Sequence, residues 1–383
     1  MILTLQTNAF GPYGGIATYN RLVCRVLNDF GPGVEKRVLL MTDTPAGIRQ
    51  PGADLPSLSL EAFAGHRRAF VQRVAGLALK ARIDLALIGH VNYAPLGLLL
   101  KRLQPQLRYG IIIYGIEAWE RQSRIHRRAM RKADFVISIS EYTKRRALEV
   151  NGPFDGRAYL LPNALEWTSE SAAPDMPLAR VPAGTHLLSV CRLDSNEKYK
   201  GVDQVIEALP EIAARVPDVQ YIVVGGGTDL ERHRELAIKT GVAERVHFLG
   251  FVDDATLRSC YRNCDLFVMP SAGEGFGFVY LEAMQYGKAV VAANSGGAPE
   301  VVLDGLTGAL VQYGDREQLA RVLIELCLDP SKRRELGQAG YQRLQAQFTF
   351  PRFKQILTET LLRELPAASV YKSRRRALTE MAH

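Results

Sequence analysis

The chain has 383 residues, of which 47% are hydrophobic and 23% charged, and its formal net charge is +8. These proportions exclude a disordered or low-complexity chain, and the length predicts two or three domains of roughly 150 residues each. The apolar runs are far shorter than the roughly 20 residues that cross a bilayer. No apolar stretch preceded by basic residues opens the chain. We therefore expect neither a membrane-spanning segment nor a signal peptide.

The distribution of charge and the number of cysteines indicate which partners and which cellular compartment to expect. Residues 1–165 carry 23 Lys and Arg against 12 Asp and Glu, whereas residues 166–383 carry 25 against 28. The first half should therefore face an anionic partner such as nucleic acid, a membrane surface or a phosphorylated substrate. Five cysteines without ligand spacing predict reduced thiols in a cytoplasmic protein, rather than a disulfide framework or a zinc site.

Short apolar runs alternate with helical patterns along the first half of the chain. A strand is expected at 1–6, then a Gly-rich turn at 11–15 and a helix over 16–28. Further apolar runs predict strands at 37–41, 85–88, 109–114, 135–139 and 158–161. Such alternation is typical of βαβ units, in which helices cover both faces of a parallel sheet.

The pattern stops at 166–182, where small and polar residues and prolines are typical of a linker. A second series of strands is then expected at 186–190, 220–224, 246–249, 266–269, 289–293 and 308–311. We therefore expect an α/β protein with two doubly wound, Rossmann-like domains, 1–165 and 183–348, that face each other across a cleft. A last helix, 349–366, should cross back to the first domain, and a basic tail, 367–383, follows it.

Two motifs near expected strand ends are suited to anions, and parallel sheets bind ligands at those ends. Gly14 and Gly15 lie between a strand and a helix, where backbone N–H groups can approach an anion. The loop after 186–190 contains Arg192, Lys198 and Lys200, which can clamp a diphosphate. The alternatives are a flexible turn for the glycines and solvated charges for the loop.

The run 223–230 is similar to a dinucleotide-binding fingerprint but fails it. Gly225 and Gly227 fit the first two glycine positions, whereas Leu230 occupies the third. We therefore expect a tight turn after the strand at 220–224 and no NAD binding.

The most specific motif contains Glu274 and Glu282, which are eight residues apart. Gly275 and Gly277 expose backbone N–H groups at the start of a helix, where phosphate or sugar oxygens can bind. Glu282 is expected about two turns into that helix. Since the backbone can serve the phosphate, Glu274 is free to accept from sugar hydroxyls or to stabilise positive charge at a sugar carbon. The alternative is an ordinary helix start with surface acids.

These motifs together resemble retaining glycosyltransferases of the GT-B architecture, most closely glycosyltransferase family 4, whose E-x7-E motif matches Glu274 and Glu282. The resemblance covers nearly the whole chain. Its shorter blocks are Gly14–Gly15, Tyr114–Trp119, Leu161–Asn163, Arg192 with Lys200–Gly201, Gly250–Val252, Gly296–Glu300 and Asp304–Gly308.

The resemblance implies transfer of a hexosyl unit from a nucleotide diphosphate sugar to a lipid-linked or saccharide acceptor in cell-surface or exopolysaccharide synthesis. It implies retention by a front-face mechanism, with Glu274 at the sugar and neither a metal nor another cofactor. UDP-sugars and GDP-mannose both remain open as donors. The residues that it implies for donor binding are Gly14, Gly15, Arg192, Lys198, Lys200, Gly225, Phe251, Gly275, Phe276, Gly277 and Glu282.

The acceptor side departs from the family, because many relatives carry His where this chain has Tyr114. His90 and Glu117 are therefore the candidate catalytic groups of the first domain, with a structural loop histidine as the alternative for His90. A GT-B epimerase, a phosphorylase or a catalytically inactive sugar-binding relative are the alternative functions.

A basic cluster follows the acceptor block. We expect it to dock on anionic lipid at the inner face of the cell membrane, with a solvated helix as the alternative. No nucleic-acid-binding module accompanies it, so nucleic acid is not expected as a partner. Its residues are Arg121, Arg124, Arg127, Arg128, Arg131 and Lys132.

Overall fold

The computed structural model describes residues 1–11, 14–31, 33–50, 53–166 and 181–366. The chain divides into two compact units: unit 1 combines the residues up to Glu166 with those from Phe350 onward, and unit 2 contains the residues between them. Most of the linker expected at 166–182 and the tail expected at 367–383 lie outside the described residues.

Unit 1 is built on a seven-stranded sheet with the order β3-β2-β1-β4-β5-β6-β7. Neighbouring strands pair in parallel, and Ile2 of β1 is in register with both Lys36 and Leu85. β1 and β4 are buried along their whole length, as apolar strands of a covered parallel sheet are. The strands are β1 (Ile2–Gln6), β2 (Lys36–Leu40), β3 (Ser59–Ala62), β4 (Leu85–Ile88), β5 (Arg108–Ile113), β6 (Phe135–Ser138) and β7 (Arg157–Leu160).

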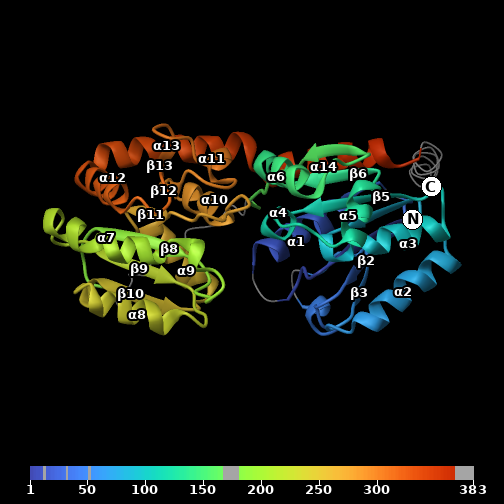
Figure 1. The fold of residues 1–383 in the computed structure, drawn as a ribbon, viewed down its shortest axis with the longest axis horizontal. Helices are drawn as coiled ribbons and strands as arrows, with labels where there is room; N and C mark the ends of the chain where they lie inside the picture. The colour runs from blue at the N-terminus through green and yellow to red at the C-terminus, as the bar shows by residue number, and fades with distance from the viewer. Residues whose placement is uncertain (12–13, 32, 51–52, 167–180, 367–383) are drawn as a thin grey trace. The chain divides into compact units, whose positions relative to one another are not determined.

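Helices alternate with these strands and pack on the sheet (Figure 1). Their apolar faces complete a core around β1, β4 and β5. In chain order they are α1 (Gly15–Asp29), α2 (Arg67–Lys80), α3 (Ala94–Leu103), α4 (Ile116–Trp119), α5 (Arg124–Arg131) and α6 (Glu141–Asn151).

The last helix of the described chain, α14 (Phe350–Glu364), belongs to unit 1, where it packs against α1; Figure 1 shows it in red. Phe353, Leu357 and Leu361 bury one face of it. Its last residue, Glu364, is fully buried and fixes the helix to two strands. The Glu364 carboxylate accepts hydrogen bonds from Tyr159 (2.5 Å) and from Arg157 (3.2 Å), and forms an ion pair of 2.5 Å with Arg108.

Unit 2 repeats the architecture with a six-stranded parallel sheet in the order β10-β9-β8-β11-β12-β13. Its strands are β8 (His186–Val190), β9 (Gln220–Val224), β10 (Val246–Gly250), β11 (Leu266–Met269), β12 (Ala289–Ala293) and β13 (Gly308–Val311). Its helices are α7 (Val202–Arg215), α8 (Leu230–Lys239), α9 (Asp254–Asn263), α10 (Phe278–Gln285), α11 (Ala298–Val301), α12 (Arg316–Leu328) and α13 (Pro330–Gln347).

The expected strands are confirmed to within one residue at each end, and two doubly wound α/β sheets are present. One strand, β3, was not predicted. It lies at the edge of its sheet and is only partly buried, so Ser59–Ala62 lacks the apolar run of a central strand. All five cysteines are unpaired, as predicted. Among the described residues, every helix is too short or too polar to cross a membrane.

Candidate active site

The candidate site of unit 2 lies where its strand order reverses. β8 is hydrogen-bonded to both β9 and β11. After β8 the chain first adds β9 and β10 on one side of it, and then β11, β12 and β13 on the other. Such a switch point, at the carboxyl ends of parallel strands, is where open α/β sheets bind ligands. The loop after β8 carries Arg192, Lys198 and Lys200, and the loop after β11 carries Glu274.

A partly buried ion pair joins the two loops. The Nζ of Lys200 donates to the Oε2 of Glu274 at 2.9 Å, and the two side chains are 17% and 16% exposed. Burial opposes the charged form of Lys200, but the Glu274 carboxylate outweighs this effect and raises the pKa of the ammonium. The site therefore holds a permanent cation beside a carboxylate, away from bulk water.

Backbone contacts fix this pair in place. The Ala272 N–H donates to the Tyr199 carbonyl at 2.9 Å, which ties the Glu274 loop to the residue before Lys200. On the other side, the Gly297 N–H donates to the Glu274 carbonyl at 2.7 Å. A Cβ atom on Gly296 would lie 2.3 Å from the same carbonyl oxygen, so the loop can approach only because a glycine stands there.

Arg192 and Lys198 lie at the surface of their loop. The Arg192 side chain is 68% exposed, and its guanidinium pairs with Glu197. Glu197 is mostly buried, and within the described chain its Oε2 has no hydrogen-bond partner. Lys198 is exposed and begins the short 3₁₀ turn that ends at Lys200. The structure thus brings Lys200, and not Lys198, to Glu274, and it identifies Glu197 as a partner that the motif analysis missed.

The helix after the Glu274 loop places Glu282 differently from the prediction. Because α10 begins only at Phe278, Glu282 lies about one turn into it, not two. Its Oε2 accepts a hydrogen bond from the Tyr261 hydroxyl at 2.6 Å, and burial raises the pKa of the carboxyl group. The Phe276 ring is buried edge-on against Phe348, so only the backbone of Phe276 faces a ligand site.

The predicted tight turn after β9 is present. Gly225 has a φ of 120°, and its N–H donates to the Gly250 carbonyl at 2.8 Å. A Cβ atom there would lie 1.9 Å from the Cys191 carbonyl, so only glycine lets the β8 and β9 loops meet. Phe251 follows β10 and is 79% exposed, with its ring against Gly226. An exposed aromatic face at this edge can stack on a planar ligand group.

Three helices that follow candidate loops begin without a side-chain cap. Their first residues follow Gly14 (α1), Gly201 (α7) and Gly277 (α10). Helix N–H groups without side-chain acceptors are suited to phosphate or sugar oxygens. Several helices elsewhere are capped by polar side chains, namely Ser140, Asp253, Asp315 and Asp329.

In unit 1, the turn before the Gly14–Gly15 pair is held by side chains that sequence reasoning missed. Asp43, which follows β2 and is buried, accepts from the Ala9 N–H at 2.7 Å. Asn20 of α1 donates to the Asn8 carbonyl at 2.8 Å. Gly14 and Gly15 themselves are exposed.

The candidate acceptor residues of unit 1 are largely engaged within the fold. The Tyr114 hydroxyl points inward and donates to Asn20 at 2.7 Å. The Oε1 of Glu117 accepts from the Tyr114 N–H at 2.6 Å and from the Gly115 N–H at 3.2 Å, and burial raises the pKa of this carboxyl group. The Nδ1 of His90 accepts from the Asn92 N–H at 3.1 Å, and burial lowers the pKa of the imidazole to about 4.

The basic cluster does not lie entirely on one helix, contrary to the prediction, because Arg121 precedes α5 and Lys132 follows it. Arg121, Arg124 and Arg128 are exposed. Arg131 and Lys132 pair with Asp155 at 3.4 and 2.8 Å, and Arg127 is partly buried. Arg131 and Lys132 are exposed as well, so the three exposed cations that form no ion pair within the described chain are Arg121, Arg124 and Arg128, around the start and middle of α5.

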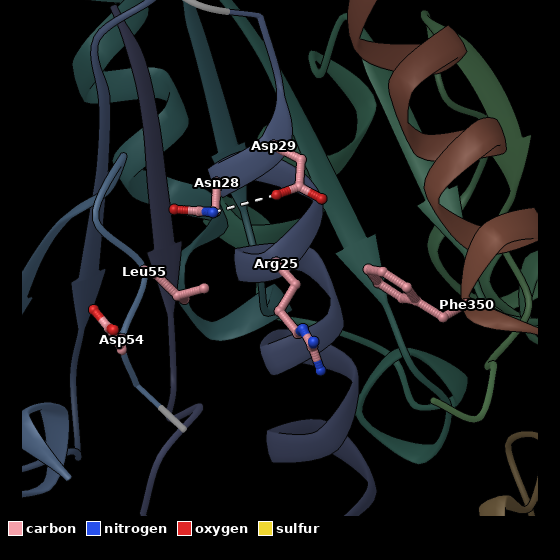
Figure 2. A pocket seen from close by; sticks show the side chains of 6 residues that line it. All are labelled: Arg25, Asn28, Asp29, Asp54, Leu55 and Phe350. Carbon is pink, nitrogen blue, oxygen red and sulfur yellow. Dashed lines mark hydrogen bonds between the residues drawn. The ribbon is translucent and has the colours of Figure 1, made fainter. Parts of the chain in front are cut away.

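A cavity of about 310 Å³ lies elsewhere in unit 1, at the end of α1 (Figure 2). Figure 2 shows three of its lining residues, Arg25 and Asp29 on α1 and Phe350 at the start of α14. A helix that follows a strand of a parallel sheet ends at the opposite edge from the strand's carboxyl end. The cavity is therefore remote from Gly14, and none of the predicted site residues lines it.

The family model for glycosyl transferases group 1 matches residues 186–343, which include both members of the ion pair. A GDP-mannose-dependent alpha-(1-6)-phosphatidylinositol monomannoside mannosyltransferase from Mycolicibacterium smegmatis is 37% identical over 266 residues, which are 64% of this chain and 68% of the relative. The chain belongs to the group 1 glycosyl transferases. A relative of the same name from Mycobacterium tuberculosis H37Rv is 36% identical over 228 residues, or 56% of this chain and 58% of the relative.

Solved structures share the fold of this group 1 glycosyl transferase. Anabaena Alr3699/HepE in complex with UDP has a TM-score of 0.77 and 24% identity, over 94% of this chain and 99% of that one. Sucrose-phosphate synthase from Thermosynechococcus elongatus has a TM-score of 0.77 and 22% identity, over 94% and 98%. The expected two-domain GT-B architecture is thereby confirmed.

Proposed function

We propose that the chain is a retaining glycosyltransferase of family 4 that moves a hexosyl unit from a nucleotide diphosphate sugar to a lipid-linked or saccharide acceptor. The observation that carries the proposal is the partly buried contact between Lys200 and Glu274 at the switch point of unit 2. A diphosphate needs a cation, and a sugar that gains positive charge at its anomeric carbon needs a carboxylate. The pair supplies both within 3 Å.

In the proposed reaction, Arg192 and Lys200 neutralise the diphosphate as it leaves, so neither a metal ion nor another cofactor is required. Glu274 contacts the transferred sugar near its anomeric carbon. The backbone N–H groups at the start of α10 bind phosphate or sugar oxygens. Glu282 accepts from the ribose hydroxyls with the carboxylate oxygen that Tyr261 leaves free.

The proposed front-face step keeps the configuration of the sugar. The bond from the anomeric carbon to the diphosphate oxygen breaks, and the bond to the acceptor oxygen forms on the same face. The departing phosphate oxygen takes the proton of the acceptor hydroxyl, so no protein base is needed. In this scheme His90 and Glu117 shape the acceptor end of unit 1. The contacts of Glu117 with the backbone and the lowered pKa of His90 agree with such a role.

We further propose GDP-mannose as the donor and a membrane lipid with a polyol phosphate headgroup as the acceptor. The support is the donor and acceptor for which the relatives at 36–37% identity are named. A second donor class, UDP-sugars, is represented by the structural neighbour Alr3699/HepE, which is solved with UDP-glucose; its identity of 23% bears on the fold alone. Arg121, Arg124 and Arg128 would hold unit 1 at the inner face of the cell membrane, where such an acceptor lies.

Thermal unfolding with GDP, UDP and their sugars tests the donor. A ligand at one hundred times its dissociation constant stabilises a protein by about 2.7 kcal/mol. We expect GDP and GDP-mannose to raise the melting temperature by several degrees, and UDP to leave it unchanged. A shift with UDP alone would overturn the donor assignment, and no shift with either nucleotide would overturn the function.

The stereochemistry is tested by NMR of the product formed from α-linked donor, with EDTA present. Retention without loss of rate supports the front-face, metal-independent reaction, whereas an inverted product or loss of rate with EDTA contradicts it. Release of an epimerised free sugar would favour the epimerase. Binding of the donor without turnover of any acceptor or water would favour the inactive sugar-binding relative.

A further inference from the structure

The loop that carries the donor cations, residues 192–200, is held by its first half to the segment before α8. The Leu193 N–H donates to the Gly226 carbonyl at 3.0 Å, and the Asp229 N–H donates back to the Leu193 carbonyl at 2.8 Å. The Ser195 N–H donates to the Thr228 hydroxyl at 3.1 Å. The position of Arg192 therefore depends on where the first turn of α8 lies.

The second half of the loop runs into another helix. Lys200 is followed by Gly201 and then by α7, whose first turn contains Asp203. Only two residues separate Asp203 from the cation that contacts Glu274. The position of Lys200 therefore depends on where the first turn of α7 lies.

One side chain of α8 connects these two helix starts. The guanidinium of Arg232 donates to both carboxylate oxygens of Asp203, at 2.9 and 3.0 Å. Its Nε donates to both carboxylate oxygens of Asp229, at 2.9 and 2.8 Å. His233, the next residue, adds an Nε2 contact of 2.9 Å to Asp203 and an Nδ1 contact of 2.8 Å to the Asp229 carbonyl.

The electrostatics show that this is a strong network. Burial alone would raise the pKa of Asp203, but hydrogen bonds from His233 and Arg232 outweigh it and lower that pKa to about 2. Hydrogen bonds from Arg232 lower the pKa of Asp229, and the charge of Lys198 in the cation loop lowers it further. Planar, bidentate pairs of this kind fix geometry as well as charge.

We propose that Arg232 is a positioning residue for the donor diphosphate: by bridging Asp203 and Asp229 it sets the spacing between the two ends of the 192–200 loop. Arg192 and Lys200 can then reach one diphosphate together. Arg232 itself contacts no substrate. The inference rests on the proposed function, because it assigns the 192–200 loop to a diphosphate.

The experiment compares Arg232→Met with Arg234→Met, a control on the same helix, where Arg234 pairs with the exposed Glu231 at 2.7 Å. Calorimetry measures the dissociation constants of the nucleoside diphosphate and the monophosphate of whichever base the wild-type chain binds. A misplaced loop should weaken diphosphate binding about tenfold and monophosphate binding much less. The preference for the diphosphate should therefore fall in Arg232→Met and stay at the wild-type value in Arg234→Met.

Equal weakening of both nucleotides by Arg232→Met would show a merely structural role and overturn the proposal, as would an unchanged preference. If Arg232→Met does not fold, Arg232→Lys decides, because a lysine keeps the charge but cannot bridge both carboxylates bidentately. We expect an intermediate preference in that variant, and a wild-type preference would overturn the proposal. A wild-type chain that binds no nucleotide would instead overturn the proposed function itself.

Discussion

The ammonium of Lys200 and the carboxylate of Glu274 lie 2.9 Å apart, on loops that leave two neighbouring strands of the same sheet. The Glu274 carboxylate raises the pKa of the Lys200 ammonium and so keeps it charged although water has little access to it. A phosphate that enters must compete with Glu274 for the Lys200 donors. The ion pair thus holds a cation ready for an anion. It also favours strongly charged ligands, because only these compete well with Glu274 for Lys200.

Breaking this pair should cost stability. Lys200→Met leaves a mostly buried carboxylate without its partner, and we expect a loss of about 1–3 kcal/mol in the free energy of unfolding. Adding Glu274→Gln to that variant should restore much of the loss, because the unpaired charge is removed. Urea unfolding of both single variants and the double variant measures the coupling. Strictly additive losses would contradict the contact, and none of the three variants should transfer sugar.

The Asp203 network predicts a specific acid sensitivity. Its pKa of about 2 in the folded chain lies below the value of about 3.9 in an unfolded one. The stabilisation is therefore present above pH 4 and is lost as the pH falls toward 2. We expect Asp203→Asn to lower the free energy of unfolding by about 2 kcal/mol at pH 6 and by about half that at pH 3. Denaturant unfolding at both pH values provides the check, and a difference that does not depend on pH would refute it.

His90 should remain neutral at physiological pH, because its pKa is lowered to about 4 by burial. The unfolded chain takes up a proton near pH 6.5, so the stability contributed by the neutral ring is lost as the pH falls from 6.5 toward 4. The C2 proton resonance of His90 should titrate near pH 4 in NMR spectra. His90→Asn, which keeps an acceptor for the Asn92 N–H, should be less sensitive to pH over this window. A resonance that titrates near 6.5 would count against a buried ring.

Glu117 should matter first for the local fold of unit 1. Glu117→Ala removes the acceptor of the Tyr114 and Gly115 N–H groups, and we expect a loss of about 1–3 kcal/mol in stability. Glu117→Gln keeps an oxygen at the same place and should recover most of it. Nucleotide affinity should change little in either variant, because Lys200, Glu274 and Glu282, which bind the donor in the proposed reaction, lie in unit 2. Calorimetric nucleotide titrations and urea unfolding test both statements, and equal losses in the two variants would exclude the capping role.

The basic surface around α5 should bind anionic membranes. The double variant Arg124→Glu, Arg128→Glu should no longer sediment with vesicles of phosphatidylglycerol. Each basic side chain near an anionic membrane surface contributes about 1 kcal/mol to binding. Arg145→Glu with Arg146→Glu on α6 makes the same charge change and serves as the control. Vesicles of phosphatidylcholine should not bind the wild-type chain. Equal loss in both pairs of variants would mean that net charge, and not this surface, decides binding.

Sequence patterns captured the parts of the fold that depend on continuous apolar runs, such as β4 and β12, which are buried along their whole length. They failed at β3, because an edge strand that is half exposed has no such run. The sequence also located the loops that carry Lys200 and Glu274, because the apolar runs of β8 and β11 directly before them are easy to recognise.

The direction of single side chains could not be predicted in the same way. Nothing in the local sequence distinguishes a Tyr114 that points inward from one that faces a ligand. Its direction depends on the packing of α1, which brings Asn20 to the Tyr114 hydroxyl. The same holds for Arg232, whose two carboxylate partners lie 3 and 29 residues away along the chain. Such contacts depend on how distant elements meet.

The return of α14 to unit 1 has a consequence for biosynthesis. A ribosome completes every residue of unit 2 before it adds Phe350, so unit 2 can fold while unit 1 still lacks its last helix. Until then, Arg108 and Arg157 have no Glu364 to pair with, and the apolar patch that covers Phe353 and Leu357 stays open. Unit 1, although translated first, should therefore be the second to reach its final form. A nascent chain halted shortly before α14 would expose that patch to chaperones.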